Sequence, residues 1–243
     1  METLSRRKLF GLGAATAAAA ALGGCSNDMS TATTKEDKKA TDAPEPAAST
    51  GAQALDRLKA GNARFVAGKP KYPDQSTKRR TELAAGQHPF ALVLSCVDSR
   101  VPPELVFDQG LGDLFVARSA GQVLDEAVRG SVEYGVAELK IPLVVVLGHE
   151  KCGAVKATLE AVEKQSPPLG NDIDALVTAI RPAVEKAEAD HASDPLDAAV
   201  RNNVANIVAA LNTDTVLKSA VAAGALRIVG ARYALSTGAV AFL

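Results

Sequence analysis

The sequence has almost no net charge and few aromatic residues. Its 243 residues carry 27 Lys and Arg against 28 Asp and Glu, aromatic residues make up 4%, and tryptophan is absent. Because no basic patch interleaved with aromatic residues is found, the sequence gives no support for nucleic-acid binding. The apolar run from Leu9 to Leu22 is shorter than the roughly 20 residues that a membrane-spanning helix needs.

Cysteine is also scarce, and its three positions are informative. Cys25 lies near the N-terminus, whereas Cys96 and Cys152 each stand next to polar residues far along the chain. A disulfide between Cys96 and Cys152 is one interpretation for an exported protein. Because that disulfide would leave the neighbouring Asp98, Arg100 and His149 without a role, we favour a metal site.

Residues 1–25 have the features of an export signal. Arg6 and Arg7 precede the apolar run, and Leu22–Cys25 (LGGC) follows it with small residues before a cysteine. The arginine pair resembles the twin-arginine export signal, and LGGC resembles a bacterial lipobox. We therefore expect export and lipidation of Cys25, which would tether the protein to the outer face of the bacterial cytoplasmic membrane. An ordinary cleaved signal with a chance cysteine is the alternative.

Residues 26–51 are predicted to be a disordered linker. They are rich in Thr, Ala, Lys, Asp, Glu, Pro and Ser, and Met29 is their only aliphatic residue larger than Ala. Such a composition cannot bury enough apolar surface to offset the entropy lost on ordering. We expect residues 52–243 to form one globular domain.

Short apolar runs alternate with amphipathic segments along this domain. The runs predict buried strands at Phe90–Ser95, Asp113–Arg118, Pro142–Gly148 and Leu226–Gly230, with an edge strand at Ala239–Leu243. Helices are predicted at Ala52–Ala67, Thr77–Ala85, Leu124–Lys140, Cys152–Val162, Asp172–Ala189, Pro195–Leu211 and Thr215–Ala222, and a short one from Pro103. The alternation predicts an α/β fold: a mostly parallel central sheet flanked by helices, with a C-terminal edge strand.

Two short motifs follow directly after predicted strands. They are Cys96–Arg100 (CVDSR) and His149–Cys152 (HEKC). In sheets of this kind ligands bind beyond the carboxyl ends of the strands, so both motifs lie where a site is expected.

Each motif has a spacing that can gather its polar side chains. Cys96, Asp98 and Arg100 alternate, so an extended segment would present them on one side. His149 and Cys152 are three residues apart, so one helical turn would place both on one face. At a helix start, we also expect Cys152 to gain thiolate character.

The combined side chains predict a catalytic zinc site. Thiolate and imidazole ligands favour zinc, and three ligands, Cys96, His149 and Cys152, leave the fourth position open, as in catalytic sites. Asp98, held ionised by Arg100, would accept a hydrogen bond from zinc-bound hydroxide. Taken singly, each residue could instead be a buried core residue or a member of a surface ion pair.

The motifs and their flanks resemble the β-class carbonic anhydrases. The family patterns Cys-x-Asp-Ser-Arg and His-x-x-Cys stand here as Cys96–Arg100 and His149–Cys152, and the flanking Leu111–Val116, Ser131–Tyr134 and Leu58–Phe65 also match. The resemblance spans residues 52–243. It departs where the family reads Arg-Asn-Ala-Gly-Asn, because this chain has Arg118–Gln122 (RSAGQ).

The resemblance implies an activity, a cofactor and partners. It implies reversible hydration of carbon dioxide to bicarbonate and a proton by hydroxide bound to one zinc ion per subunit, oriented by the Asp98–Arg100 dyad. It assigns Gln109 and Gly153 to substrate binding, Gln109 often reaching the pocket across a dimer interface. We expect a homodimer or homotetramer whose only contact with the membrane is a lipid anchor.

Three alternatives stay open from the sequence. The same fold could hydrolyse carbon disulfide or carbonyl sulfide, or the chain could be a non-catalytic zinc-binding lipoprotein. The sequence also leaves open whether Asp98 itself ligates zinc and closes the site or pairs with Arg100 and leaves it open.

Overall fold

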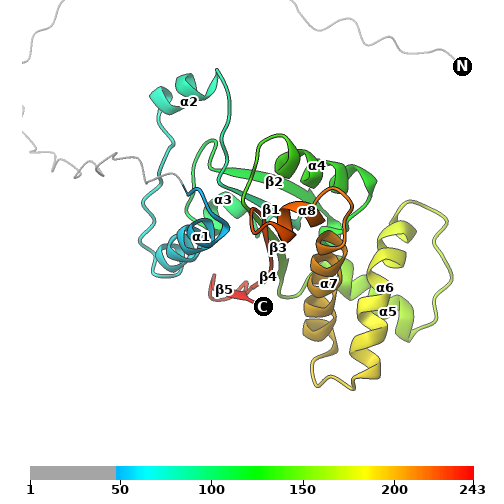
Figure 1. The fold of residues 1–243 in the computed structure, drawn as a ribbon. Helices are drawn as coiled ribbons and strands as arrows, with labels where there is room; N and C mark the ends of the chain where they lie inside the picture. The colour runs from blue at the N-terminus through cyan, green and yellow to red at the C-terminus, as the bar shows by residue number, and fades with distance from the viewer. Residues whose placement is uncertain (1–47) are drawn as a thin grey trace, which may run out of the picture. The chain divides into compact units, whose positions relative to one another are not determined.

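A five-stranded sheet is the centre of the computed structural model, which describes residues 48–243 (Figure 1). The strand order is β2-β1-β3-β4-β5; the first four strands are parallel, and β5 runs antiparallel to β4. This arrangement confirms the predicted α/β fold with a C-terminal edge strand. The strands are β1 Ala91–Cys96, β2 Leu114–Ser119, β3 Leu143–His149, β4 Arg227–Tyr233 and β5 Val240–Phe242.

The central strands are apolar throughout because both faces of the sheet are covered. Every residue of β1 and β3 is buried. Along β1 the side chains alternate between two core clusters, with Val93 in one and Leu92 and Leu94 in the other. This double burial explains why the strands read as continuous apolar runs rather than as an alternating pattern.

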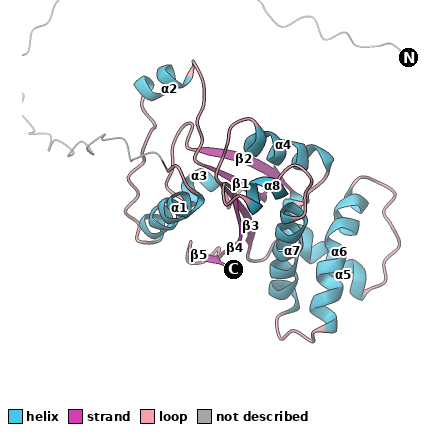
Figure 2. Cartoon of the chain, in the orientation of Figure 1, coloured by secondary structure: helices cyan, strands magenta, loops and turns pink. Residues whose placement is uncertain are grey.

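Helices form the layers on the two faces (Figure 2). The helices α1 and α3 contribute to the first cluster, and α4 and α7 contribute to the second. A third cluster joins α5, α6 and α7 beside the carboxyl end of β1. The helices are α1 Gly51–Val66, α2 Thr77–Leu83, α3 Pro103–Val106, α4 Glu126–Ala137, α5 Gly153–Glu163, α6 Ile173–Ala189, α7 Pro195–Asn212 and α8 Lys218–Ala222, with a 3-10 turn η1 at Ala120–Gln122.

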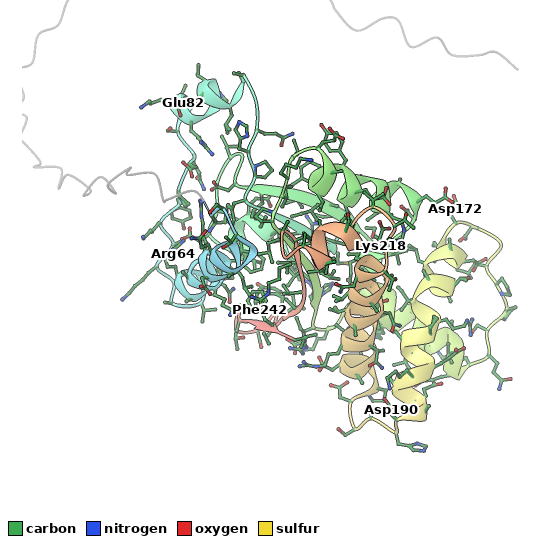
Figure 3. All side chains as sticks on the ribbon, in the orientation of Figure 1. Arg64, Glu82, Asp172, Asp190, Lys218 and Phe242 are labelled. Atoms are coloured by element: carbon green, nitrogen blue, oxygen red, sulfur yellow. The ribbon has the colours of Figure 1, made fainter. Side chains whose placement is uncertain are left out.

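Asn62 fastens α1 to two other parts of the fold. It is buried, its Nδ2 donates to the carbonyls of Val106 and Gly238, and its Oδ1 accepts from the N–H of Val240. These bonds connect α1 to the end of α3 and to the turn between β4 and β5. Figure 3 labels Arg64 on α1 and Phe242 on β5, the elements that Asn62 brings together.

The helix boundaries differ from the predictions where side chains cap them. The carboxylate of Asp125 accepts from the N–H of Val128, so α4 begins after the predicted Leu124. The carboxylate of Asp214 accepts from the N–H groups of Val216 and Leu217, and this turn delays α8. The turn η1 was not predicted.

The predictions for the N-terminal segment lie largely outside the described residues. These are the export signal, the lipobox with Cys25, and the linker up to residue 47. Within residues 48–243, every helix is too short or too polar to cross a bilayer.

Gly61 should be irreplaceable in α1. A Cβ at this position would lie 1.8 Å from the carbonyl oxygen of Phe107, which is backbone and cannot turn aside. We expect Gly61→Ala to lower the free energy of unfolding by about 1–3 kcal/mol, measured by urea denaturation. Gly130→Ala in α4 is the control: its Cβ would meet nothing within 4 Å, and its better helix propensity should raise stability by up to about 1 kcal/mol. Equal stability of the two variants would contradict this packing.

Candidate metal centre

Two thiols and one imidazole converge at the carboxyl ends of β1 and β3. Cys96 ends β1, His149 ends the neighbouring β3, and Cys152 is the N-cap of α5. Their ligand atoms all lie within 4.8 Å of one another, and all three residues are buried. The thiols of Cys96 and Cys152 are free, so the disulfide alternative is wrong.

The path from His149 to Cys152 differs from the predicted helical turn. His149 still belongs to β3, Glu150 and Lys151 form a turn, and Lys151 adopts a left-handed φ of 53°. Cys152 has extended backbone angles. A strand end, a tight turn and a helix cap therefore bring the two ligands together, and the predicted helical turn is wrong.

The segment after Cys96 is a turn and not an extended strand. The N–H of Val101 donates to the carbonyl of Asp98, and the N–H of Arg100 donates to the Asp98 carboxylate. The prediction that alternation carries Cys96, Asp98 and Arg100 onto one side of a strand is therefore wrong. The turn nevertheless brings Asp98 close to the cluster, with its Oδ2 3.9 Å from Nε2 of His149.

His149 presents an unpartnered nitrogen to the cluster. Its ring is fully buried, its Nδ1 lies 2.9 Å from the carbonyl oxygen of Glu150, and its Nε2 has no hydrogen-bond partner among the described residues. A buried polar atom without a partner costs free energy. A cation bound by this nitrogen and the two sulfurs removes that cost, and this donor set suits zinc.

The two thiols shift each other's pKa in opposite directions. Cys152 donates a hydrogen bond to Cys96, which is the main reason that the pKa of Cys96 falls to about 4 despite its burial. The same hydrogen bond, followed by burial, raises the pKa of Cys152. N–H groups at the start of α5 act in the opposite direction and lower the pKa of Cys152, as predicted for a cysteine at a helix start. Metal binding would release any proton carried by these thiols, because cysteine binds metals as thiolate.

Asp98 is held ionised by Arg100. Nε and Nη2 of Arg100 donate to the two carboxylate oxygens of Asp98 over 2.9 and 2.7 Å. These bonds hold the pKa of Asp98 well below its usual range. The Asp98 side chain is 17% exposed and the Arg100 side chain 55% exposed, so the dyad lies between the buried cluster and solvent.

Two groups that support Cys96 were not predicted from the sequence. Arg118 at the end of β2 donates to the carbonyls of Cys96 and Asp98 over 2.7 and 2.6 Å. The N–H of Gly121 donates to the sulfur of Cys96 over 3.3 Å. Both contacts cross from β1 to the segment that begins at β2, so no short spacing reveals them. The only signal in the sequence for these contacts was Arg118, a basic residue at the end of the predicted strand Asp113–Arg118.

The departures from the family pattern lie in this same segment. The hydroxyl of Ser119 donates to the carbonyl of Val123 over 2.7 Å. Gln122 is 1% exposed, and neither atom of its amide has a hydrogen-bond partner among the described residues. Because Gly121 between them contacts the sulfur of Cys96, the two departures lie next to a ligand.

The two predicted substrate-binding residues lie in different surroundings. Gln109 is buried; its Oε1 accepts from Arg57, and its Nε2 donates to the carbonyl of Phe107. No hydrogen bond among the described residues joins Gln109 to the cluster. Gly153 follows Cys152, and a Cβ there would meet nothing within 4 Å, so this position leaves open space beside the ligand.

Comparison with known proteins identifies the family. The family model described as carbonic anhydrase matches residues 91–240, which include the whole cluster. The chain is 46% identical over 182 residues to carbonic anhydrase 2 of Mycobacterium tuberculosis, covering 74% of this chain and 87% of the relative. The chain belongs to the β-class carbonic anhydrase family. The carbonic anhydrase of Mycolicibacterium smegmatis is 47% identical over 184 residues, covering 75% of this chain and 88% of the relative.

Solved β-carbonic anhydrases share this fold. The Coccomyxa enzyme, in complex with acetazolamide, is 28% identical and covers 78% of this chain and 81% of its own, with a TM-score of 0.61. A structure from Sordaria macrospora, described as one of two tetrameric β-carbonic anhydrases, is 25% identical and covers 68% of this chain and 85% of its own, also with a TM-score of 0.61. Zinc is the cofactor of this family, and the cluster of Cys96, His149 and Cys152 fits it.

Cys152→Ser should abolish zinc binding. A serine hydroxyl is a poor replacement for a thiolate, and two remaining ligands are too few for a stable site. Metal analysis of the purified variant should show zinc falling from about one ion per subunit to a trace. Cys25→Ser, which removes the third cysteine, is the control and should keep its zinc. Full zinc content in Cys152→Ser would remove this residue from the ligand set.

Proposed function

We propose that this protein is a zinc-dependent carbonic anhydrase that catalyses the reversible hydration of carbon dioxide to bicarbonate and a proton. The observation that carries the proposal is the cluster of Cys96, His149 and Cys152 within 4.8 Å, with the ionised Asp98 beside it. Cys96, His149 and Cys152 would hold the zinc ion, and three protein ligands is the number typical of catalytic zinc sites.

Neighbouring groups of the protein hold each ligand in place. Arg118 and the N–H of Gly121 hold Cys96, the carbonyl of Glu150 orients the ring of His149, and the start of α5 carries Cys152. Bound zinc would supply a Lewis acid that lowers the pKa of water toward neutrality. The three ligands are buried, so bulk water is excluded from their side of the site. Substrate would approach from the side of the partly exposed Asp98 and Arg100.

Asp98 orients the nucleophile in this proposal. Arg100 occupies both of its oxygens with strong, charge-assisted hydrogen bonds and keeps it anionic, so the carboxylate can only accept further hydrogen bonds. A water that donates to Asp98 is therefore fixed with a lone pair free to attack carbon dioxide. Pairing with Arg100 also favours the open site over the closed one in which Asp98 ligates zinc.

Asp98→Asn should keep zinc and lose activity. The amide preserves the shape of Asp98 but presents a donor where an acceptor is needed, so we expect a loss of about 100-fold in hydration rate by stopped flow. Asp190→Asn, exposed at the end of α6 (Figure 3), is the control and should be unaffected. Unchanged hydration by Asp98→Asn would refute the role of the dyad.

The pH profile of the hydration rate of the wild type, measured by stopped flow, should show no titration of Asp98 near neutrality. Its pKa lies below the usual range in the folded protein, so the negative charge is lost only as the pH falls through that depressed value.

The proposal extends to a homodimer or homotetramer with carbon dioxide and bicarbonate as small-molecule ligands. Support comes from a cavity of about 310 Å³ lined in part by Gln109, Tyr72 and Leu105, where Tyr72 is 60% and Leu105 52% exposed. A second subunit would cover these apolar side chains. In such an assembly Gln109 would serve the site of its partner, and Gly153 would leave room for substrate in its own.

We further propose that the enzyme acts outside the cytoplasmic membrane as a lipoprotein. The pattern of residues 1–25, with paired arginines, an apolar run and Cys25 after two glycines, supports export and lipidation. The composition of residues 26–51 supports a flexible tether to the catalytic domain, and this tether ends where Thr50 caps α1 and Gly51 begins it.

Cys25→Ser should release the protein from the membrane. We expect the wild type, expressed in a bacterium that processes lipoproteins, to sediment with the membrane fraction and to enter a detergent phase. Cys25→Ser should appear in the soluble extracytoplasmic fraction, because the acyl chains that would hold it are missing. Cys152→Ser is the matched control and should stay with the membrane. Membrane retention of Cys25→Ser would refute the lipid anchor.

A further inference from the structure

Glu150 has contacts that its place between two ligands does not explain. It follows His149 and precedes Lys151 and Cys152 in the turn between β3 and α5. It uses three groups at once: its carbonyl, its N–H and its carboxylate each form a hydrogen bond. The proposed function uses only its carbonyl, which orients His149, and leaves its carboxylate without a role.

The carbonyl of Glu150 sets the orientation of the His149 ring. Nδ1 of His149 lies 2.9 Å from this oxygen, so Nδ1 carries the proton and donates it to the carbonyl. The proton on Nδ1 leaves the lone pair of Nε2 for the ion, and the hydrogen bond fixes the angle of the ring. Groups that orient a ligating histidine in this way strongly affect metal affinity.

That carbonyl can orient the ring only if Glu150, the residue that carries it, is held in place. The N–H of Glu150 donates to the carbonyl of Tyr233, the last residue of β4 and the register partner of His149. One Glu150 carboxylate oxygen, Oε2, accepts from the N–H of Leu235 over 3.0 Å. These two hydrogen bonds therefore fasten the turn to the end of β4 and to the residues that follow it.

The turn needs this fastening because its next residue is exposed and strained. Lys151 is exposed and adopts a φ of 53°, a conformation that lysine rarely takes. Without an anchor the turn could relax by rotating the peptide between Glu150 and Lys151. The carbonyl that faces His149 belongs to that peptide, so the rotation would take it away from the ring.

We propose that Glu150 is a positioning residue for zinc: its carboxylate, bound to the N–H of Leu235, holds the peptide that orients His149 toward the ion. The proposal rests on the proposed function in that the ion is zinc. It makes a separate claim, because zinc affinity can be measured whether or not the protein turns over carbon dioxide.

The experiment compares Glu150→Ala with Glu150→Gln in the full chain. Alanine removes the acceptor, whereas glutamine keeps an oxygen that can accept from Leu235 and removes only the charge. Glu160→Ala on α5, whose exposed carboxylate pairs with Lys156 and Lys164, is the matched control. Zinc affinity is measured by competition with a chromophoric chelator, and circular dichroism confirms that each variant is folded.

We expect Glu150→Ala to weaken zinc binding at least about tenfold, and Glu150→Gln to restore it to within about threefold of the wild type. The nitrogen resonances of His149 in the zinc-loaded protein should show a rigid ring protonated at Nδ1 in the wild type and Glu150→Gln. The same resonances should be broadened in Glu150→Ala.

Two results would overturn the proposal. One is a zinc affinity of Glu150→Ala equal to that of the wild type and Glu160→Ala. The other is a Glu150→Gln variant as weak as Glu150→Ala, which would show that charge and not the hydrogen bond matters. Failure of the proposed function would look different: the wild type would bind zinc tightly and show no hydration activity.

Discussion

The parallel pairing of β1 with β3 is the constraint on which the metal centre depends. Ser95 lies opposite Leu147 in this register, so the two strands end side by side with Cys96 and His149 as their last residues. A slip of the register by one residue would turn the side chains of one strand to the opposite face and separate sulfur from nitrogen. Core packing on both faces thus fixes the distance between two ligands.

The polar groups around the cluster form a buried set and a partly exposed set. The ligands are buried, and neighbouring peptide groups and Arg118 satisfy or orient them. The dyad is partly exposed and carries its charge as a bidentate ion pair. Low dielectric strengthens the first group of contacts, whereas Asp98 remains ionised because Arg100 is adjacent. One end of the sheet can therefore hold a cation and still admit water.

Much of this arrangement could be predicted from the sequence because apolar runs and motif spacing are local signals. The continuous runs at Phe90–Ser95 and Pro142–Gly148 identified the two central strands, and the rule for strand ends placed both motifs at one edge. The conformation inside the motifs was predicted wrongly. His149 and Cys152 meet through a left-handed Lys151, and Asp98 sits in a turn, because hydrogen bonds from the side chain and backbone compete there with regular structure.

The point at which the chain enters the domain has a practical consequence. Gly51, the first residue of α1, packs so closely on Pro142 and Arg227 that a Cβ would lie 2.7 Å from an atom of each. These two residues stand at the amino ends of β3 and β4, and β3 runs for seven residues before it reaches His149. At about 3.3 Å per residue, that separates entry and metal centre by roughly 20 Å. Immobilising this domain on a bead or electrode through its N-terminal side would leave the carboxyl end of the sheet, where the metal centre lies, accessible to carbon dioxide and bicarbonate.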